Sequence, residues 1–227
     1  MSAFANGWSA IKIGQLSDNF LHMEKSMPLE YTPEFEARVQ AWVEARLKPK
    51  RIPHVRGVVE TADWMAQLYA PHQRMQARLA AWIHDAAKKL PDEELIRLAK
   101  LHHLPISEGE KMVPMLLHGA VGYMLAAQEF GLDDPQLQTA CAYHTTGDPT
   151  MNALDMIVYV ADLIEPTRDF PGVDALRTAA QVSLEVVTLM ATDFTLRYLI
   201  ERGKYIDPRP VHLHNRLVQA GVTYTRN

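Results

Sequence analysis

The sequence has a single cysteine, no excess of positive charge and no long apolar run. Cys141 stands alone in 227 residues, which excludes an internal disulfide and is typical of a reducing compartment. No stretch approaches the roughly 18 consecutive apolar residues of a membrane-spanning helix. The chain also starts without the basic residues and apolar core of a secretory signal. We therefore expect a cytoplasmic protein with no membrane partner.

Positive charge is not in excess either. The 27 acidic and 23 basic side chains leave a net charge of -4 with histidine neutral, so the chain lacks the broad positive field that attracts nucleic-acid polymers. Hydrophobic residues make up 48% of the chain and charged residues 22%, which is ordinary globular composition and excludes disorder. Ten histidines against one cysteine are the unusual count. A bound metal would therefore need imidazole and carboxylate ligands.

From Thr32 onward, apolar residues recur at spacings of three and four, the period of an α-helix. A helix starting at Thr32-Pro33-Glu34 is followed by predicted helices over 54–69, 73–90, 92–101, 114–130, 134–144, 153–165, 173–182, 183–202 and 210–220. The boundary at 182–183 is weak, and one continuous helix is the alternative. Strand patterns with hairpin signals are missing. We expect an all-α fold with one domain over 31–220 and a tail of 221–227. Residues 1–30 are either a flexible N-terminal extension or the result of a start codon assigned upstream of the true one.

Several polar residues interrupt the apolar faces of these helices. Asp162 shares the inward face of its helix through its spacing of four from apolar residues. His84, Asp85 and Lys88 fall on one flank of the predicted helix over 73–90. The histidines that lie on apolar stripes are His54, His84, His118 and His144. Buried carboxylates and imidazoles need partners. A shared metal satisfies them together, and this nitrogen and oxygen donor set suits iron, manganese, zinc or another divalent transition metal.

Each of these residues also has a purely structural interpretation. One histidine on an apolar stripe is more often a hydrogen-bonded core residue than a ligand. Asp162 would equally fit as the buried partner of an arginine. The adjacent pair His84-Asp85 favours a ligand role more strongly, because sequential ligands need a backbone shaped for them. The histidines given no role are His22, His72, His102, His103, His212 and His214.

The order of the inward-facing residues resembles a known signature. His54, then His84-Asp85, then Asp162 is similar to the H...HD...D pattern of the HD-domain metal-dependent phosphohydrolases, a helical superfamily. Further segments resemble its YqeK branch, the symmetrical diadenosine tetraphosphatases: His118–Gly122, Tyr143–Gly147, Val160–Pro166, Arg168–Gly172 and Arg197–Lys204. The resemblance covers roughly residues 33 to 220.

This resemblance implies a helical HD-domain bundle with additional C-terminal helices and a dinuclear metal centre. The ligands that it implies are His54, His84, Asp85 and Asp162 for one metal, and His118 and His144, with Asp85 bridging, for the second. The resemblance favours iron. The residue chemistry also admits manganese, zinc, cobalt or nickel.

The reaction that the resemblance implies is hydrolysis of diadenosine tetraphosphate, or a related dinucleoside polyphosphate, to two molecules of ADP. A metal pair activates the attacking water, so no protein nucleophile is needed. Because the chain is slightly negative, local cations must help to hold a polyanion. Lys88, three residues after Asp85, is the first candidate for a catalytic and phosphate-binding cation, and Arg168 is the second. Both are equally well explained as structural charges, Arg168 as a brace of the turn that follows it.

Two other functions stay open. The same ligand set would serve an HD-domain phosphohydrolase acting on another nucleotide, such as a mononucleotide, a cyclic nucleotide or an alarmone. The other alternative is a non-catalytic nucleotide-sensing or ribosome-associated binding protein, although no motif ligand is missing here. Thr145, Thr146 and Gly147 are interpreted as helix-end residues, and the sequence assigns no adenine contact. The apolar C-terminal helices either close the core or form the interface of a homodimer, and the sequence leaves both open.

Overall fold

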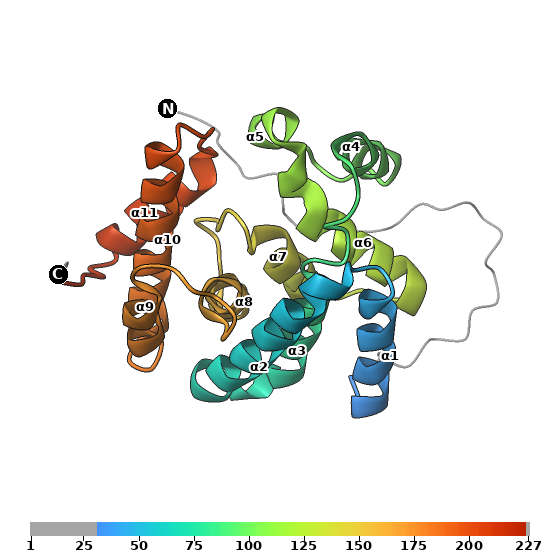
Figure 1. The fold of residues 1–227 in the computed structure, drawn as a ribbon, viewed down its shortest axis with the longest axis horizontal. Helices are drawn as coiled ribbons and strands as arrows, with labels where there is room; N and C mark the ends of the chain where they lie inside the picture. Colours follow the sequence, from blue (N-terminus) through green and yellow to red (C-terminus); the bar gives the residue numbers. More distant parts are fainter. Residues whose placement is uncertain (1–30, 226–227) are drawn as a thin grey trace.

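The computed structural model describes residues 31–225, and within this part of the chain all regular structure is helical (Figure 1). The α-helices are α1 (Pro33–Glu44), α2 (Ile52–Tyr69), α3 (Arg74–Ile83), α4 (Asp92–Leu101), α5 (Glu108–Met112), α6 (His118–Phe130), α7 (Pro135–Tyr143), α8 (Ala153–Ile164), α9 (Val173–Ala179), α10 (Leu184–Glu201) and α11 (Pro208–Gln219). Short 3₁₀ helices are η1 (Pro49–Arg51), η2 (Pro71–Gln73) and η3 (Pro114–Leu117). The all-α class is confirmed.

The predicted domain boundaries lie close to the ends of the described residues. Residues 1–30, predicted as an extension, lie outside the described residues, as do the last two residues of the predicted tail. The division of the chain at 31 and 220 therefore stays a prediction. Among the described helices, none has the length and apolar content needed to cross a membrane.

Capping side chains set several helix starts. The Thr32 side chain accepts a hydrogen bond from Phe35 N (3.2 Å) and begins α1. The Ser183 side chain accepts from Val186 N in the same way (3.2 Å). Because Ser183 caps α10, the segments before and after it are two helices rather than one. The short helix α5 was not predicted, although its capping box between Ser107 and Glu110 is visible in the sequence.

The predicted helix over 73–90 is wrong in its second half. The helix α3 ends at Ile83, and the chain continues in tight turns with bonds three residues apart, such as Lys88 N to Asp85 O at 2.9 Å. At this point α6 crosses closely, since a Cβ atom on Gly122 would lie 3.1 Å from Ile83 O. Ala86 and Ala87 fit a helix and a turn equally well, so the apolar periodicity of the sequence does not show that α3 ends at Ile83. His84 and Asp85 thus lie just beyond a helix and not on its flank.

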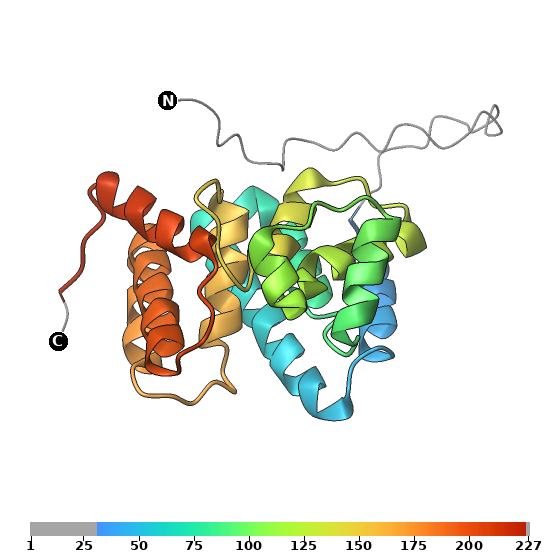
Figure 2. The same cartoon turned by 90° about the horizontal axis from the view of Figure 1, so that it is seen from above.

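Helix α8 lies at the centre of the arrangement. It packs against α2 and α7 on one side and against α10 on the other. The views from the front and from above show α9, α10 and α11 grouped on the far side of α8 from α1 to α6 (Figures 1 and 2). Apolar side chains such as Leu154 and Ile157 of α8 and Leu137 of α7 are fully buried between these layers. This packing holds in place the helix ends from which the polar residues project.

Candidate metal site

Side chains singled out from the sequence come together where the ends of α3 and α7 and the start of α6 meet α2 and α8. They are His54, His84, Asp85, His118, His144 and Asp162. The potential ligand atoms of His54, His84 and Asp85 all lie within 4.8 Å of one another, and so do those of Asp85, His118 and His144. Asp162 adjoins the first group, with its Oδ1 atom 3.0 Å from His54 Nε2. Asp85 belongs to both groups, which is the position that a bridging ligand takes.

Three of the imidazole rings are oriented by their own helix ends. His84 and His144 cap the C-termini of α3 and α7, and His118 follows η3. In each ring Nδ1 lies within hydrogen-bonding distance of the carbonyl three residues earlier, at 2.6 Å for His84, 2.5 Å for His118 and 2.7 Å for His144. Helix ends leave such carbonyls unpaired. Because a carbonyl only accepts, Nδ1 carries the proton and Nε2 presents a lone pair to the site.

His54 is oriented by a residue that the sequence did not single out. Its Nδ1 atom donates to Glu165 Oε1 at 2.9 Å, and Glu165 is fully buried at the end of α8. The carboxylate also accepts from the backbone N–H of Thr167 at 2.7 Å. The Glu165 side chain packs closely against α2 at Gly57, since a Cβ atom on Gly57 would lie 2.5 Å from Glu165 Oε2. Glu165 lies within a family-like segment, and its spacing of four from Ala161 and seven from Val158 is the signal that could have identified it.

The donor atoms fit a metal. The Nε2 atoms of His118 and His144 face each other at 3.0 Å, and with both Nδ1 atoms protonated this places two lone pairs in contact. The buried atoms His54 Nε2, His84 Nε2 and Asp85 Oδ1 make no hydrogen bond in the structure. Buried polar atoms normally have partners. A cation shared among these nitrogens and oxygens supplies the missing partner, and the donor set is that of a transition-metal site.

Burial sets the protonation that such a site requires. It lowers the pKa of the His84 imidazole and lowers that of His144 well below its usual value, so both rings are neutral near pH 7, as metal ligands must be. Burial opposes ionisation of Asp85, but the His84 and His118 rings and Lys88 hold its pKa well below the usual range. The cluster therefore combines neutral rings at His84 and His144 with an ionised carboxylate at Asp85.

Two cations contact the shared carboxylate. Lys88 Nζ lies 3.7 Å from Asp85 Oδ1 and 3.0 Å from His118 Nε2. Arg51, which the sequence did not single out, donates from Nε to Asp85 Oδ2 at 2.6 Å. Its position three residues before His54, on the same helical face, is the signal that could have identified it. Both side chains are about one-third exposed, so both reach from the carboxylate toward solvent.

The other predicted cation, Arg168, is attached to the site through Asp162. Its guanidinium donates to Asp162 Oδ1 and to the Asp162 carbonyl, each at 2.8 Å. Asp162 is thus the partner of an arginine as well as a member of the cluster. The loop after α8 is braced by Arg177, which donates to the carbonyls of Ile164, Glu165 and Arg168. The phosphate-binding role of Arg168 stays a prediction.

Comparison with known proteins connects this geometry to a family. The HD domain family model matches residues 51–167, a segment that contains the whole cluster and begins at Arg51. The chain belongs to the HD-domain family. The resemblance noted in the sequence is therefore confirmed, and the C-terminal helices α9 to α11 are additions beyond the matched HD domain.

Relatives of this HD-domain chain extend over most of its length. It is 34% identical to the symmetrical bis(5'-nucleosyl)-tetraphosphatase of Bacillus subtilis over 78% of this chain and 95% of that protein. It is 35% identical to the protein of the same name from Halalkalibacterium halodurans, over 78% and 93%. A solved structure of a predicted HD superfamily hydrolase involved in NAD metabolism, from Clostridium acetobutylicum, covers 86% of this chain and all of that one, with 34% identity and a TM-score of 0.78.

Removing the buried carboxylate of Glu165 should weaken metal binding without removing a proposed ligand. The Glu165→Ala variant leaves His54 Nδ1–H without its acceptor, and loss of such an outer contact typically reduces metal affinity about 10–100-fold. Glu165→Gln keeps an acceptor and should lose less. Chelator competition measures the affinity, with Glu185→Ala, an exposed glutamate on α10, as the control. Equal affinities in Glu165→Ala and wild type would show that His54 needs no such support.

Proposed function

We propose that this HD domain is a metal-dependent hydrolase that cleaves diadenosine tetraphosphate and related dinucleoside polyphosphates symmetrically, giving two molecules of ADP. The observation that carries the proposal is the pair of ligand groups that share buried Asp85. The names of the relatives from Bacillus subtilis and Halalkalibacterium halodurans support the substrate.

The proposed metal ligands fall into two sets that meet at Asp85. The first set is His54, His84, Asp85 and Asp162, and the second is Asp85, His118 and His144. When bound, two such metals supply a water of lowered pKa and stabilise charge on the phosphate. We propose iron, which the family resemblance supports, while the nitrogen and oxygen donors also admit manganese, zinc, cobalt or nickel.

The protein's own contribution is orientation and local positive charge. The Nδ1 contacts described above turn each Nε2 atom inward, so the ligand geometry is fixed before substrate arrives. Beside the cluster, a groove of about 290 Å³ is lined by Leu47 and by five cations: Lys48, Lys50, Arg51, Lys88 and Lys89. We call it the basic groove. It offers a polyphosphate chain a series of cations, of which Arg51 and Lys88 contact Asp85.

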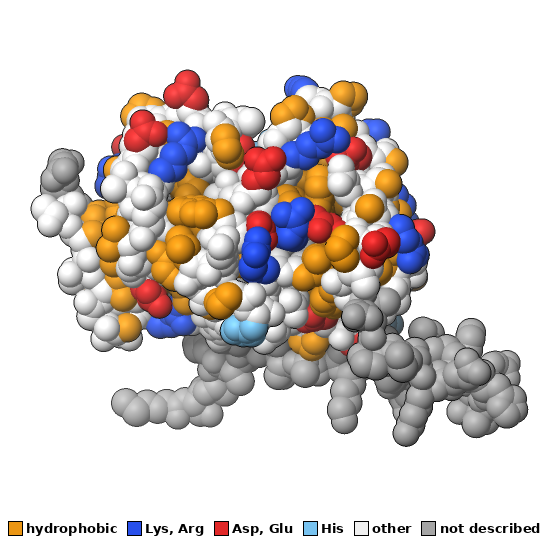
Figure 3. Space-filling model, turned by 90° about the horizontal axis from the view of Figure 1, so that it is seen from below, with side chains coloured by type: hydrophobic (Ala, Val, Ile, Leu, Met, Phe, Trp, Pro, Cys, Tyr) orange, Lys and Arg blue, Asp and Glu red, His pale blue; other side chains and the backbone are white. Residues whose placement is uncertain are grey.

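Cations and anions are mixed on one face of the molecule. On the face shown in Figure 3, Lys and Arg side chains are interspersed with Asp and Glu, in keeping with the net charge of -4. Recognition of a polyanion therefore depends on the cluster and its adjoining groove. We also propose that the protein is cytoplasmic and has no nucleic-acid polymer as partner. We further propose that it forms a homodimer, which light scattering would test.

Lys88 is the cation whose loss should matter most to turnover. Burial lowers its pKa, and its Nζ atom lies beside Asp85 and His118. Lys88→Met removes this charge and should lower kcat/KM by about 10²-fold, as is usual when one electrostatic stabiliser is lost. Lys100→Met, on the exposed face of α4, is the control. If the two variants had the same activity, Lys88 would be a structural charge only.

Product analysis tests the proposed reaction directly. Protein purified without chelator should convert diadenosine tetraphosphate to ADP alone, as judged by chromatography. AMP with ATP as products, or preferential hydrolysis of a mononucleotide, a cyclic nucleotide or an alarmone, would contradict the assignment. Elemental analysis of the same preparation tests the dinuclear centre and identifies the metal. Fewer than one metal per chain, with no hydrolysis of any nucleotide, would favour a binding protein.

A further inference from the structure

A cavity of about 250 Å³ opens beside the second ligand group. We call it the apolar cavity. Its walls include Leu116 from η3, Thr145 after α7, Thr195 and Leu199 from α10, and Lys204 and Tyr205 from the loop after α10. It thus lies between the HD core and the C-terminal helices. Segments that resembled the family in the sequence, 143–147 and 197–204, both contribute to its walls. Apart from His144, no residue of these segments has a role in the reaction described so far.

Two wall residues of the apolar cavity adjoin the second ligand group. Thr145, in its wall, places Oγ1 within 2.9 Å of His144 Nε2. Leu116, also in its wall, follows Met115, whose carbonyl accepts from His118 Nδ1. His144 is therefore next in the chain to a wall residue, and His118 lies two residues from another. A molecule with a phosphate at the cluster has the cavity as its immediate neighbour.

The chemistry of the apolar cavity fits a nucleobase better than a phosphate. Its walls are mainly apolar, and an apolar wall disfavours a polyanion because charge there loses its hydration. Its volume lies below the about 300–1,000 Å³ of pockets that take drug-sized ligands, so it suits one base and not a whole dinucleotide. Tyr205 is 42% exposed, which leaves part of an aromatic ring available for stacking on a base.

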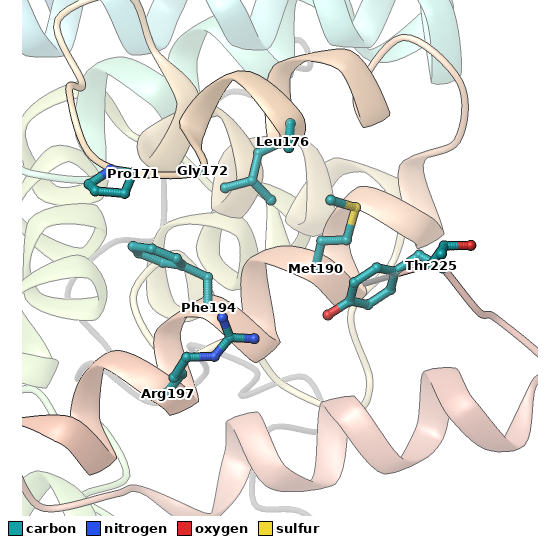
Figure 4. A pocket seen from close by; sticks show the side chains of 9 residues that line it. Pro171, Gly172, Leu176, Met190, Phe194, Arg197 and Thr225 are labelled. Carbon is teal, nitrogen blue, oxygen red and sulfur yellow. The ribbon is translucent and has the colours of Figure 1, made fainter. Parts of the chain in front are cut away.

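The other cavities fit this role less well. The basic groove borders the cluster on its Asp85 side, but its five cations suit phosphates. A pocket of about 210 Å³ between α9 and α10 contains Leu176, Met190 and Phe194, with Arg197 beside Phe194 (Figure 4). None of the residues that line it belongs to the ligand groups. The apolar cavity alone among these three combines apolar walls with contact to a proposed ligand.

We propose that the apolar cavity is the subsite for one nucleobase of the substrate, with Tyr205 stacking on the base and Leu199 forming the floor that limits its size. This inference rests on the proposed function, which it deepens. The phosphate chain then runs from this cavity across the cluster toward the basic groove. A substrate with two identical halves is bound by two different surfaces, and one ADP product keeps its base in the cavity.

Calorimetric binding of ADP and of inorganic pyrophosphate to the metal-loaded full chain tests the subsite, since pyrophosphate has no base. Tyr205→Ala should weaken ADP binding about 10-fold, which corresponds to ~1.4 kcal/mol, and should leave pyrophosphate binding unchanged. Tyr205→Phe, which keeps the ring, should bind ADP like wild type. Leu199→Trp, which fills the cavity, should weaken ADP binding further. Tyr198→Ala, an exposed tyrosine of α10 that does not line the cavity, is the matched control.

The outcomes separate this inference from the proposed function. If Tyr205→Ala and Leu199→Trp bind ADP like wild type while wild type still produces ADP from diadenosine tetraphosphate, the subsite is wrong and the function stands. Equal loss of ADP and pyrophosphate binding would also overturn the subsite. A selective loss of ADP binding in a protein that leaves diadenosine tetraphosphate intact would retain the nucleobase subsite and overturn the proposed substrate.

Discussion

Asp85→Ala is expected to abolish hydrolysis and to reduce the metal content from two ions to fewer than one per chain. Asp85 is fully buried and is the residue common to both ligand groups, so one substitution removes a donor from each of the two proposed metals. The loss of activity should be at least about 10³-fold, since metal charge and its activated water are lost together. Asp133→Ala, on an exposed loop, is the control for general effects.

Metal content and activity measured on the same samples decide this prediction. Circular dichroism should show that Asp85→Ala keeps its helices, because Arg51 and Lys88 can turn to solvent once the carboxylate is gone. His118→Ala affects the second group alone and should retain about one metal per chain with much reduced turnover. Wild-type turnover in either variant would contradict a reaction that needs both metals.

Gly119→Ala is expected to destabilise the protein and to disturb the second ligand group. A Cβ atom at this position would lie 2.0 Å from Cys141 O and 2.9 Å from His144 Nδ1. The same carbonyl accepts the 2.7 Å hydrogen bond from His144 Nδ1, so the added methyl group would press on both partners of the bond that orients this ring. Overpacking of this kind typically lowers the free energy of unfolding by about 1–3 kcal/mol.

Gly131→Ala is the matched control for this effect, because Gly131 lies at the end of the same helix. It has a positive φ of 69° and open space around it, so alanine there should cost about 1 kcal/mol through backbone strain. Denaturant unfolding compares the two variants, and elemental analysis shows whether metal is lost. If Gly119→Ala unfolded like wild type and kept two metals, the close crossing of α6 and α7 would not support the site.

Much of this cluster could be predicted from the sequence because its residues break an apolar pattern. His118 and Asp162 were found as polar residues where the helical period calls for apolar ones, and the HD signature grouped them with the others. The prediction failed where tertiary contact decides the local structure. The end of α3 at Ile83 depends on the crossing of α6, which the alanines after it do not reveal.

The supporting residues were harder to predict for a different reason. Glu165 and Arg51 act through contacts with partners 111 and 34 residues away, and each stands at the end of its helix, where a charged side chain is ordinary even on the apolar face. Charged residues of this kind look like ordinary surface charge until the fold brings their partners close. From the sequence, an arginine partner and a ligand role for Asp162 were alternatives. In the structure the Asp162 carboxylate contacts both Arg168 and His54.

The four imidazole rings of the cluster are oriented in two ways, by a nearby carbonyl or by a distant carboxylate. His84, His118 and His144 are aimed by carbonyls within their own turns, so short pieces of chain preset them at little loop-closure entropy. His54 is aimed only once α2 and the end of α8 have met. Fraying of the α8 terminus would therefore release the His54 ring alone, while the other three rings keep the carbonyl contacts that orient them.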